Sequence, residues 1–274
     1  MQLKDIYIYP IKSLGGIRVE QAKLETRGLQ NDRRYMLTTI AGEFMTQRTV
    51  REMALFRTAI RGNEILVWRK GELDNVLTIP MQPTTFIQEQ TVEVWGLESI
   101  CQVMPKTINE WFQDQLKMDC QLVYMPDNAE RRMKEKYNKA RDLVSFADGA
   151  PILIIGQAGL DDLNSRLEKP VMMNRFRPNL VFTGGAPFEE DNWQKLQVGR
   201  AHFKITHRCE RCNVPNINQE TALIDKEPNR TLAKFRRFDR AIYVGVNAVW
   251  EAGLSNQVDE IRVGDEIVRS VTAI

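Results

Sequence analysis

Residues 55–68 read LFRTAIRGNEILVW, and this stretch indicates most plainly how the chain folds. Two runs rich in apolar residues, 55–60 and 64–68, flank the turn-forming segment Arg61-Gly62-Asn63. Glycine and asparagine tolerate the backbone angles of a tight reversal, so the pattern predicts a β-hairpin. We therefore expect β-sheet structure in this part of the chain.

Further short strands are expected on both sides of this hairpin, at the spacing typical of a β-barrel or sandwich. They are 2–9, 17–24, 34–40, 43–47, 76–79, 91–95, 100–104 and 120–124. The first helix is expected late, over 107–118, because apolar residues recur there near helical spacing.

The second half of the chain mixes helices and strands. Helices are predicted at 156–169 and 231–238, and strands at 180–183, 201–206, 241–250 and 260–270. A turn cluster at 126–128 suggests the boundary between two domains, 1–125 and 126–274. The segment 131–141 carries six basic residues against one acidic residue. It is either a solvated helix or loop, or a docking surface for an acidic partner.

The composition excludes several classes of protein. With 274 residues, 43% hydrophobic and 27% charged, the chain has the composition of a soluble globular protein. A net charge of +2 gives no electrostatic case for nucleic-acid binding. Neither a signal segment nor a run of 18 apolar residues occurs, so no membrane span and a cytoplasmic location are expected. The four cysteines are too few for a secreted disulfide scaffold.

Two of these cysteines, in His207-Arg208-Cys209-Glu210-Arg211-Cys212, lie beside arginine residues. Positive charge favours a thiolate, and soft sulfur selects soft or redox-active metals. A thioredoxin-like redox pair, a zinc site formed with His202 and His207, and two purely structural thiols remain alternatives. The favoured interpretation is a cofactor metal bound through one sulfur.

Four other polar clusters combine turn formers with cations or hydrogen-bond donors. Together, converging loops of this kind could hold a phosphate-bearing cofactor without a glycine-rich fingerprint. Taken singly, each charged residue in them is more often a surface charge or turn former. They are Tyr9-Pro10-Ile11-Lys12-Ser13, Asn31-Asp32-Arg33-Arg34-Tyr35, Ser145-Phe146-Ala147-Asp148-Gly149 and Asn174-Arg175-Phe176-Arg177-Pro178-Asn179.

The order of these motifs resembles the MOSC family, named for the molybdenum cofactor sulfurase C-terminal domain. It is most similar to the group containing the amidoxime-reducing component and bacterial enzymes that detoxify N-hydroxylated purine bases, without their appended ferredoxin domain. The matching pieces are Tyr9 to Ser13, Gly28-Leu29 with Asp32-Arg33, Thr46 with Arg48, Ser145 to Asp148, Phe176 to Leu180, Glu190 to Trp193, Cys209 to Cys212, Lys226 to Pro228 with Thr231-Leu232, and Arg262 to Asp265.

The resemblance implies a β-rich α+β protein with an N-terminal MOSC β-barrel domain over 1–125. A C-terminal MOSC β-barrel domain with flanking helices would follow over 126–274. A pterin-based molybdenum cofactor would lie between the domains, and pyridoxal phosphate is not expected. Cys212 would ligate molybdenum, and Asp148, if it faces the site, could relay protons. The cofactor-binding residues implied by the match are Lys12, Ser13, Arg33, Arg48, Arg177, Asn179 and Arg211.

The activity implied by the resemblance is molybdenum-dependent reduction of N-hydroxylated compounds such as amidoximes, hydroxylamines or hydroxylaminopurines. Electrons would come from a separate flavin or iron–sulfur partner protein. The chain departs from its relatives after Cys212, where Pro215-Asn216 and Ala222 replace threonines and a glycine, and Glu210 stands where a small residue is common. Two alternatives therefore stay open: a carrier of the cofactor or of sulfur without turnover, and a protein that keeps the fold without a cofactor.

Overall fold

The computed structural model describes residues 1–254 and 259–271. Positions 255–258, and the end of the predicted second domain at 272–274, lie outside the described residues. Strands dominate the described part, which also contains three α-helices and several 3-10 helices. The β-rich α+β class expected from the sequence is confirmed.

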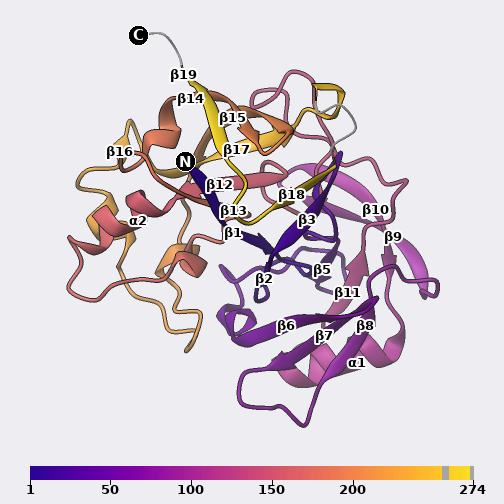
Figure 1. The fold of residues 1–274 in the computed structure, drawn as a ribbon. Helices are drawn as coiled ribbons and strands as arrows, with labels where there is room; N and C mark the ends of the chain where they lie inside the picture. The colour runs from indigo at the N-terminus through magenta and orange to yellow at the C-terminus, as the bar shows by residue number, and fades with distance from the viewer. Residues whose placement is uncertain (255–258, 272–274) are drawn as a thin grey trace.

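The largest sheet combines the start of the chain with its second half, and Figure 1 shows the indigo strand β1 beside β13. In spatial order its strands are β19 (Ile267–Val271), β14 (Trp193–Val198), β15 (Ala201–Glu210), β17 (Ala241–Trp250), β12 (Ile152–Gly156), β13 (Leu180–Thr183), β1 (Gln2–Ile8) and β2 (Ile17–Val19), with β16 (Arg237–Phe238) paired to β17. The domain boundary near residue 126 stays a prediction, but β1 belongs to the sheet of the second half.

Three smaller sheets complete the strand pattern. They are β5 (Tyr35–Thr38), β11 (Gln121–Tyr124), β10 (Leu97–Val103) and β9 (Gln88–Val94); β6 (Phe56–Arg61), β7 (Glu64–Arg69) and β8 (Leu77–Pro80); and β18 (Glu260–Arg262), β3 (Gln21–Glu25) and β4 (Gly28–Leu29). The predicted hairpin at 55–68 is confirmed, because β6 and β7 pair from Phe56–Arg69 to Arg61–Glu64. Gly62 in its turn has a φ of +59°, which glycine adopts at little cost.

Alternating burial explains how these strands form their cores. In β1 the side chains of Leu3, Ile6 and Ile8 are buried, whereas those of Gln2 and Lys4 are exposed. A shift of register between Leu3 and Asp5 separates Leu3 from the alternating pair Ile6 and Ile8. Strands β5 and β11 differ, because all four residues of each are buried. One apolar cluster packs the large sheet against the small sheet of β3, β4 and β18, and a second cluster packs β5–β8 and β11 against the first helix.

The three helices are α1 (Lys106–Leu116), α2 (Gln157–Asn164) and α3 (Asn229–Leu232). Helix α2 is shorter than the predicted 156–169, because the Asn164 side chain bonds both backbone groups of Val171 at 2.9 and 3.0 Å and turns the chain back. The predicted helix over 231–238 is also wrong in extent. Its last two residues form β16, which pairs with β17.

Strand pairing does not close the sheets into barrels within the described residues, so the barrel part of the fold prediction is not reproduced by the hydrogen-bond pattern. The largest sheet is an open path from β19 to β2, although a bridge between Gln2 and Glu266 links β1 to the segment before β19. None of the described helices is long and apolar enough to cross a membrane.

Candidate functional site

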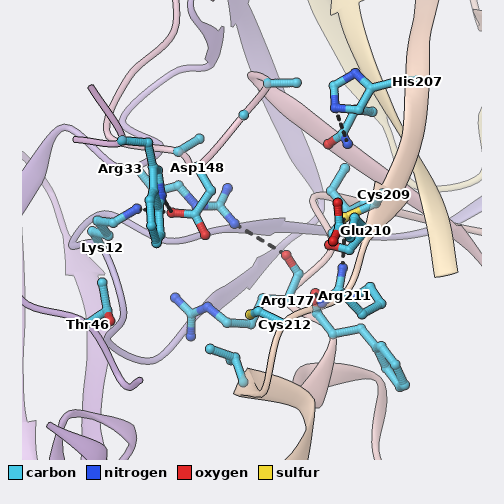
Figure 2. A pocket seen from close by; sticks show the side chains of 18 of the residues that line it. Lys12, Arg33, Thr46, Asp148, Arg177, His207, Cys209, Glu210, Arg211 and Cys212 are labelled. Carbon is cyan, nitrogen blue, oxygen red and sulfur yellow. Dashed lines mark hydrogen bonds and ion pairs between the residues drawn. The ribbon is translucent and has the colours of Figure 1, made fainter. Parts of the chain in front are cut away.

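A cavity of about 740 Å³ lies where segments from both halves of the chain meet. Figure 2 shows Lys12 and Arg33 reaching it from one side, and Cys209, Glu210 and Arg211 from the opposite side. Cavities of this size bind drug-sized ligands and cofactors. Cations outnumber carboxylates in the lining, which favours an anionic ligand. The cations of the lining are Lys12, Arg33, Arg48, Lys134, Arg177, Arg208 and Arg211, and the carboxylates are Asp148 and Glu210.

Asp148 is the centre of a series of contacts that links Lys12 to Cys212. Lys12 Nζ forms an ion pair with Asp148 Oδ1. Arg48 Nη1 donates to Asp148 Oδ2 at 3.2 Å, and the same nitrogen lies 3.3 Å from Cys212 Sγ. Trp95 Nε1 also donates to Oδ1, at 3.1 Å. The sulfur of residue 212 is therefore tied to the charged groups of the cavity.

The charges of Lys12 and Asp148 depend on each other. The Lys12 side chain is 6% exposed, and burial lowers its pKa to about 8 against the opposing effect of Asp148. Its ammonium group also donates to the carbonyl oxygen of Phe146 at 2.7 Å. Partial burial of the half-exposed Asp148 side chain would raise its pKa, but Lys12 and Arg48 outweigh that effect and hold the pKa well below its usual range. The carboxylate therefore stays ionised at neutral pH.

Two arginines enclose the ring of Tyr9 next to this group. The guanidinium carbons of Arg33 and Arg177 lie 4.5 and 4.3 Å from the ring centroid. Arg33 is fixed further by Asp32 Oδ2 at 2.6 Å and Asn179 Oδ1 at 3.0 Å. Burial lowers the pKa of Arg177 to about 10, and Arg33 acts in the same direction. Two like charges held this close favour an anion between or beside them.

Three residues implied by the family resemblance have an unusual backbone. Ser13, Arg33 and Arg177 have φ angles of +68°, +50° and +56°, in the left-handed region that non-glycine residues rarely adopt. Such strain costs of order 1 kcal/mol or more per residue, and it tends to gather at binding and active sites. Of the ten non-glycine residues with positive φ in the described chain, these three and Trp95 line the cavity.

The two cysteines differ in their surroundings, although both line the cavity. Cys209 Sγ accepts from Arg211 Nη1 at 3.1 Å, whereas Cys212 contacts Arg48. Two bulges interrupt the pairing of β15 with β17, between Ile205 and His207 and between Arg208 and Glu210. Bulges re-aim side chains, so several successive residues at the end of this strand reach the same cavity. The strand predicted to end at 206 continues to Glu210.

His207 is held as a neutral imidazole. Thr206 Oγ1 donates to the carbonyl oxygen of Asn247 at 3.1 Å, so it accepts from His207 Nδ1–H at 3.0 Å. His207 Nε2 then accepts from Asn247 Nδ2 at 3.0 Å. Burial, with a smaller effect of Lys136, lowers the pKa of His207 to about 4. The ring stacks on Tyr137 at 4.2 Å between centroids, so it forms part of the cavity wall.

The structure brings to this one cavity every site residue that the family resemblance implies: Lys12, Ser13, Arg33, Arg48, Asp148, Arg177, Asn179, Arg211 and Cys212. Their individual roles stay predictions. Trp95 and Tyr137 also line the cavity but were not among the candidates. Neither residue belongs to a motif of the sequence. Each comes from a segment that only the fold brings to the cavity.

Two sequence interpretations change. In the described part of the chain, no three His, Cys, Asp or Glu side chains gather as metal ligands, so the zinc alternative has no geometric support. The basic segment 131–141 forms no helix. Arg131 within it is 1% exposed and donates to the carbonyl oxygens of Val94, Ser145 and Ala147. It is therefore a structural residue and not part of a docking surface.

Family models match both halves of the chain. A model of the MOSC N-terminal beta barrel domain matches residues 1–119, and a model of the MOSC domain matches residues 141–268. Among solved structures, the YUAD protein from Bacillus subtilis matches 99% of this chain and 96% of its own, at a TM-score of 0.40 and 9% identity.

Two groups of relatives match nearly the whole chain. Mitochondrial amidoxime reducing component 2 of Bos taurus is 30% identical over 281 residues, which cover 98% of this chain and 83% of the relative. Molybdenum cofactor sulfurase of Oryza sativa is 31% identical over 296 residues, covering 98% of this chain. The chain spans only 36% of that sulfurase. On this similarity, and on the two domain matches in succession, the chain belongs to the MOSC family.

Proposed function

We propose that the cavity binds a pterin molybdenum cofactor and that the protein reduces N-hydroxylated compounds such as amidoximes, hydroxylamines and hydroxylaminopurines. The observation that carries the proposal is the contact series from Lys12 through Asp148 and Arg48 to Cys212, because it places one thiol beside a cationic cavity. The names of the amidoxime reducing relatives support amidoximes as substrates, and the other N-hydroxylated compounds follow from the family resemblance alone.

The chemistry of the cavity fits an anionic cofactor with a metal. Arg177 Nη2 and Arg211 Nε are buried without a hydrogen-bond partner in the protein, and an unpaired buried donor is costly. Both arginines line the cavity. Phosphate oxygens are strong acceptors for guanidinium donors, and a thiolate is a suitable ligand for molybdenum beside them.

Each residue has a defined part in this proposal. Lys12, Arg33 and Arg177 would hold the phosphate, since their positive charges lie in loops that the large sheet fixes. Ser13, Arg48, Asn179 and Arg211 would bind the remainder of the pterin. Cys212 would ligate the metal in preference to Cys209, as the family resemblance implies, and Cys212 is the thiol that Arg48 links to Asp148. When bound, the molybdenum cofactor supplies the two-electron chemistry that removes oxygen from the substrate.

The charge states revise the role expected for Asp148. A carboxylate whose pKa lies well below its usual range is a poor proton donor at neutral pH. Its contacts instead orient Lys12 and Arg48.

The test combines metal analysis with turnover. We expect the purified protein to contain molybdenum and to reduce benzamidoxime with an artificial electron donor. Cys212→Ser should abolish metal retention and activity, whereas Cys209→Ser should keep much of both. Equal loss in the two variants would contradict a single sulfur ligand and indicate that both thiols are required.

A carrier of molybdenum cofactor or of sulfur is the second candidate function. It is favoured by the two thiols, each with its own arginine, that open to the same cavity. The sulfurase relatives, which match nearly the whole chain, are consistent with it. Molybdenum without turnover in the same assay would support the carrier and contradict the reductase.

We propose that the reductase takes its electrons from a separate partner protein, a flavoprotein or an iron–sulfur protein. We propose that the exposed part of segment 131–141, which includes Lys136 and Lys139, docks an acidic partner. Turnover with a protein reductase should then fall with rising salt and with charge reversal of these two lysines. Rates insensitive to both would rule this surface out.

A further inference from the structure

Trp95 occupies a position that its residue type disfavours. It forms, with Gly96, the two-residue turn between β9 and β10, where Val94 pairs with Leu97. The φ angles of Trp95 and Gly96 are +58° and +76°. Hairpin turns of this kind favour asparagine or glycine at the first position, and a bulky aromatic residue there is an outlier. The chain therefore keeps a tryptophan where the turn itself would favour another residue.

The indole has specific partners at the mouth of the cavity. Its Nε1 donates to Asp148 Oδ1 at 3.1 Å, although the two residues are 53 positions apart in the chain. The guanidinium carbon of Arg48 lies 4.6 Å from the ring centroid. Phe44 packs edge-on against the same ring at 5.1 Å between centroids. The side chain remains 42% exposed, so burial alone does not explain its retention.

These partners are the groups that approach the proposed metal ligand. Asp148 Oδ1 also takes the ion pair with Lys12, and Asp148 Oδ2 takes a hydrogen bond from Arg48. Arg48 Nη1 in turn lies 3.3 Å from Cys212 Sγ. Trp95 thus contacts two of these groups in different ways. Its N–H donates to the Asp148 carboxylate, and its ring packs against the Arg48 guanidinium. Its displacement would release both at once.

We propose that Trp95 is a positioning residue, whose indole fixes Asp148 and Arg48 so that Arg48 keeps its contact with Cys212. The left-handed backbone of Trp95 is then the cost of bringing an indole from the N-terminal hairpin to the cavity. The readout by turnover rests on the proposed function, whereas the positioning contacts themselves can be measured in the metal-free chain.

The experiment compares Trp95→Asn and Trp95→Phe with Trp111→Phe. Trp95→Asn improves the turn, and Trp95→Phe keeps a ring over Arg48 but removes the N–H. Trp111 is a matched control, because its Nε1 also donates to a side chain, Asn75 Oδ1 at 2.7 Å, but it does not line the cavity. Stability in urea, molybdenum content, kcat and KM for benzamidoxime are measured for each.

We expect Trp95→Asn to unfold at the same or higher urea concentration than the parent. Its kcat should nevertheless fall about tenfold or more, because misplaced catalytic groups slow the reaction. Trp95→Phe should show a smaller loss of kcat, and Trp111→Phe should leave kcat unchanged. Unchanged kcat in Trp95→Asn, or a loss that only follows a loss of stability, would overturn the proposal.

A parent protein without molybdenum or turnover would contradict the proposed function but not the positioning role. That role is then decided by a double-mutant cycle of Trp95→Phe and Asp148→Ala in urea unfolding of the metal-free chain. We expect coupling of roughly fivefold in the unfolding equilibrium constant, as for a hydrogen bond to a partly exposed carboxylate. Additive effects would overturn the positioning role. Should the alanine variant not fold, a cycle of Trp95→Asn and Arg48→Gln replaces it, because Trp95→Asn removes the ring that lies over Arg48; coupling supports the positioning role and additive effects overturn it.

Discussion

Glu190 gives a test of the structure that needs neither cofactor nor substrate. Its side chain is completely buried, its Oε1 accepts from the backbone N–H of Gly156 at 3.2 Å, and its Oε2 has no partner. Burial raises the pKa of Glu190 from 4.5 to about 7, and Asp191 adds to the effect. The folded protein therefore binds this proton more tightly than the unfolded chain does, and stability falls as the pH rises from about 4.5 to about 7.

The size of the effect follows from the raised pKa. At about 1.4 kcal/mol per pH unit, an ionised Glu190 costs the folded state about 3 kcal/mol above pH 7. Glu190→Gln keeps the shape and the acceptor for Gly156 but carries no charge. We expect its stability advantage over the parent to grow by roughly 2 kcal/mol between about pH 5 and about pH 8.

Urea unfolding at several pH values measures this difference, and Glu98→Gln serves as the control, because Glu98 is exposed on β10. The control should show no comparable change with pH. A constant difference between Glu190→Gln and the parent across the range would refute the assignment of a buried, uncompensated carboxyl group. A pH-dependent difference of opposite sign would show that the carboxylate has a cationic partner in solution.

Two further substitutions test the packing around the cavity. Arg131→Met removes donors from three buried backbone carbonyl groups and should cost about 3 kcal/mol or more in urea unfolding, whereas exposed Lys139→Glu should change stability little. Comparable losses in both variants would contradict the structural role of Arg131. Gly245→Ala places a Cβ 2.7 Å from the carbonyl oxygen of Ile154 at a φ of +78°, and should cost about 2–3 kcal/mol. Gly62 also has a positive φ, but a Cβ added there would meet no atom within 4 Å, so Gly62→Ala should cost only about 1 kcal/mol. Equal losses of stability in the two variants would show that the clash at Gly245 does not contribute.

Local patterns predicted the elements whose structure depends on neighbouring residues. The hairpin at 55–68 was predicted because its turn and its alternation lie in one short segment. Helix α2 was predicted too long, because its end depends on a side-chain contact between Asn164 and Val171. Strand β12 was missed, since a short apolar run such as 152–155 fits either a strand or a buried helix.

The residues of the candidate site likewise include some that local sequence predicts and some that only the fold reveals. The motif residues were found because loops with cations or thiols can be recognised one segment at a time, and the structure brings them to one cavity. Trp95 could not be found, because its role depends on contact between a hairpin tip and Asp148. Arg131 was misread as surface charge for a similar reason. Its acceptors are backbone carbonyl oxygens, which leave no trace in residue type.

The position of β1 explains why these loops meet at all. Tyr9 follows β1 directly, Arg177 precedes β13, and the two strands pair antiparallel at Ile6 and Leu180. That pairing brings Tyr9 beside Arg177. Arg33 also lies over the Tyr9 ring, because its backbone N–H donates to the Tyr9 carbonyl oxygen at 2.7 Å. Arg33 and Arg177 keep a left-handed backbone only because the surrounding structure fixes their conformation. The pairing of β1 with the sheet of the second half provides that constraint. The cationic site is therefore a consequence of a sheet shared by the two ends of the sequence, and neither family domain carries it alone.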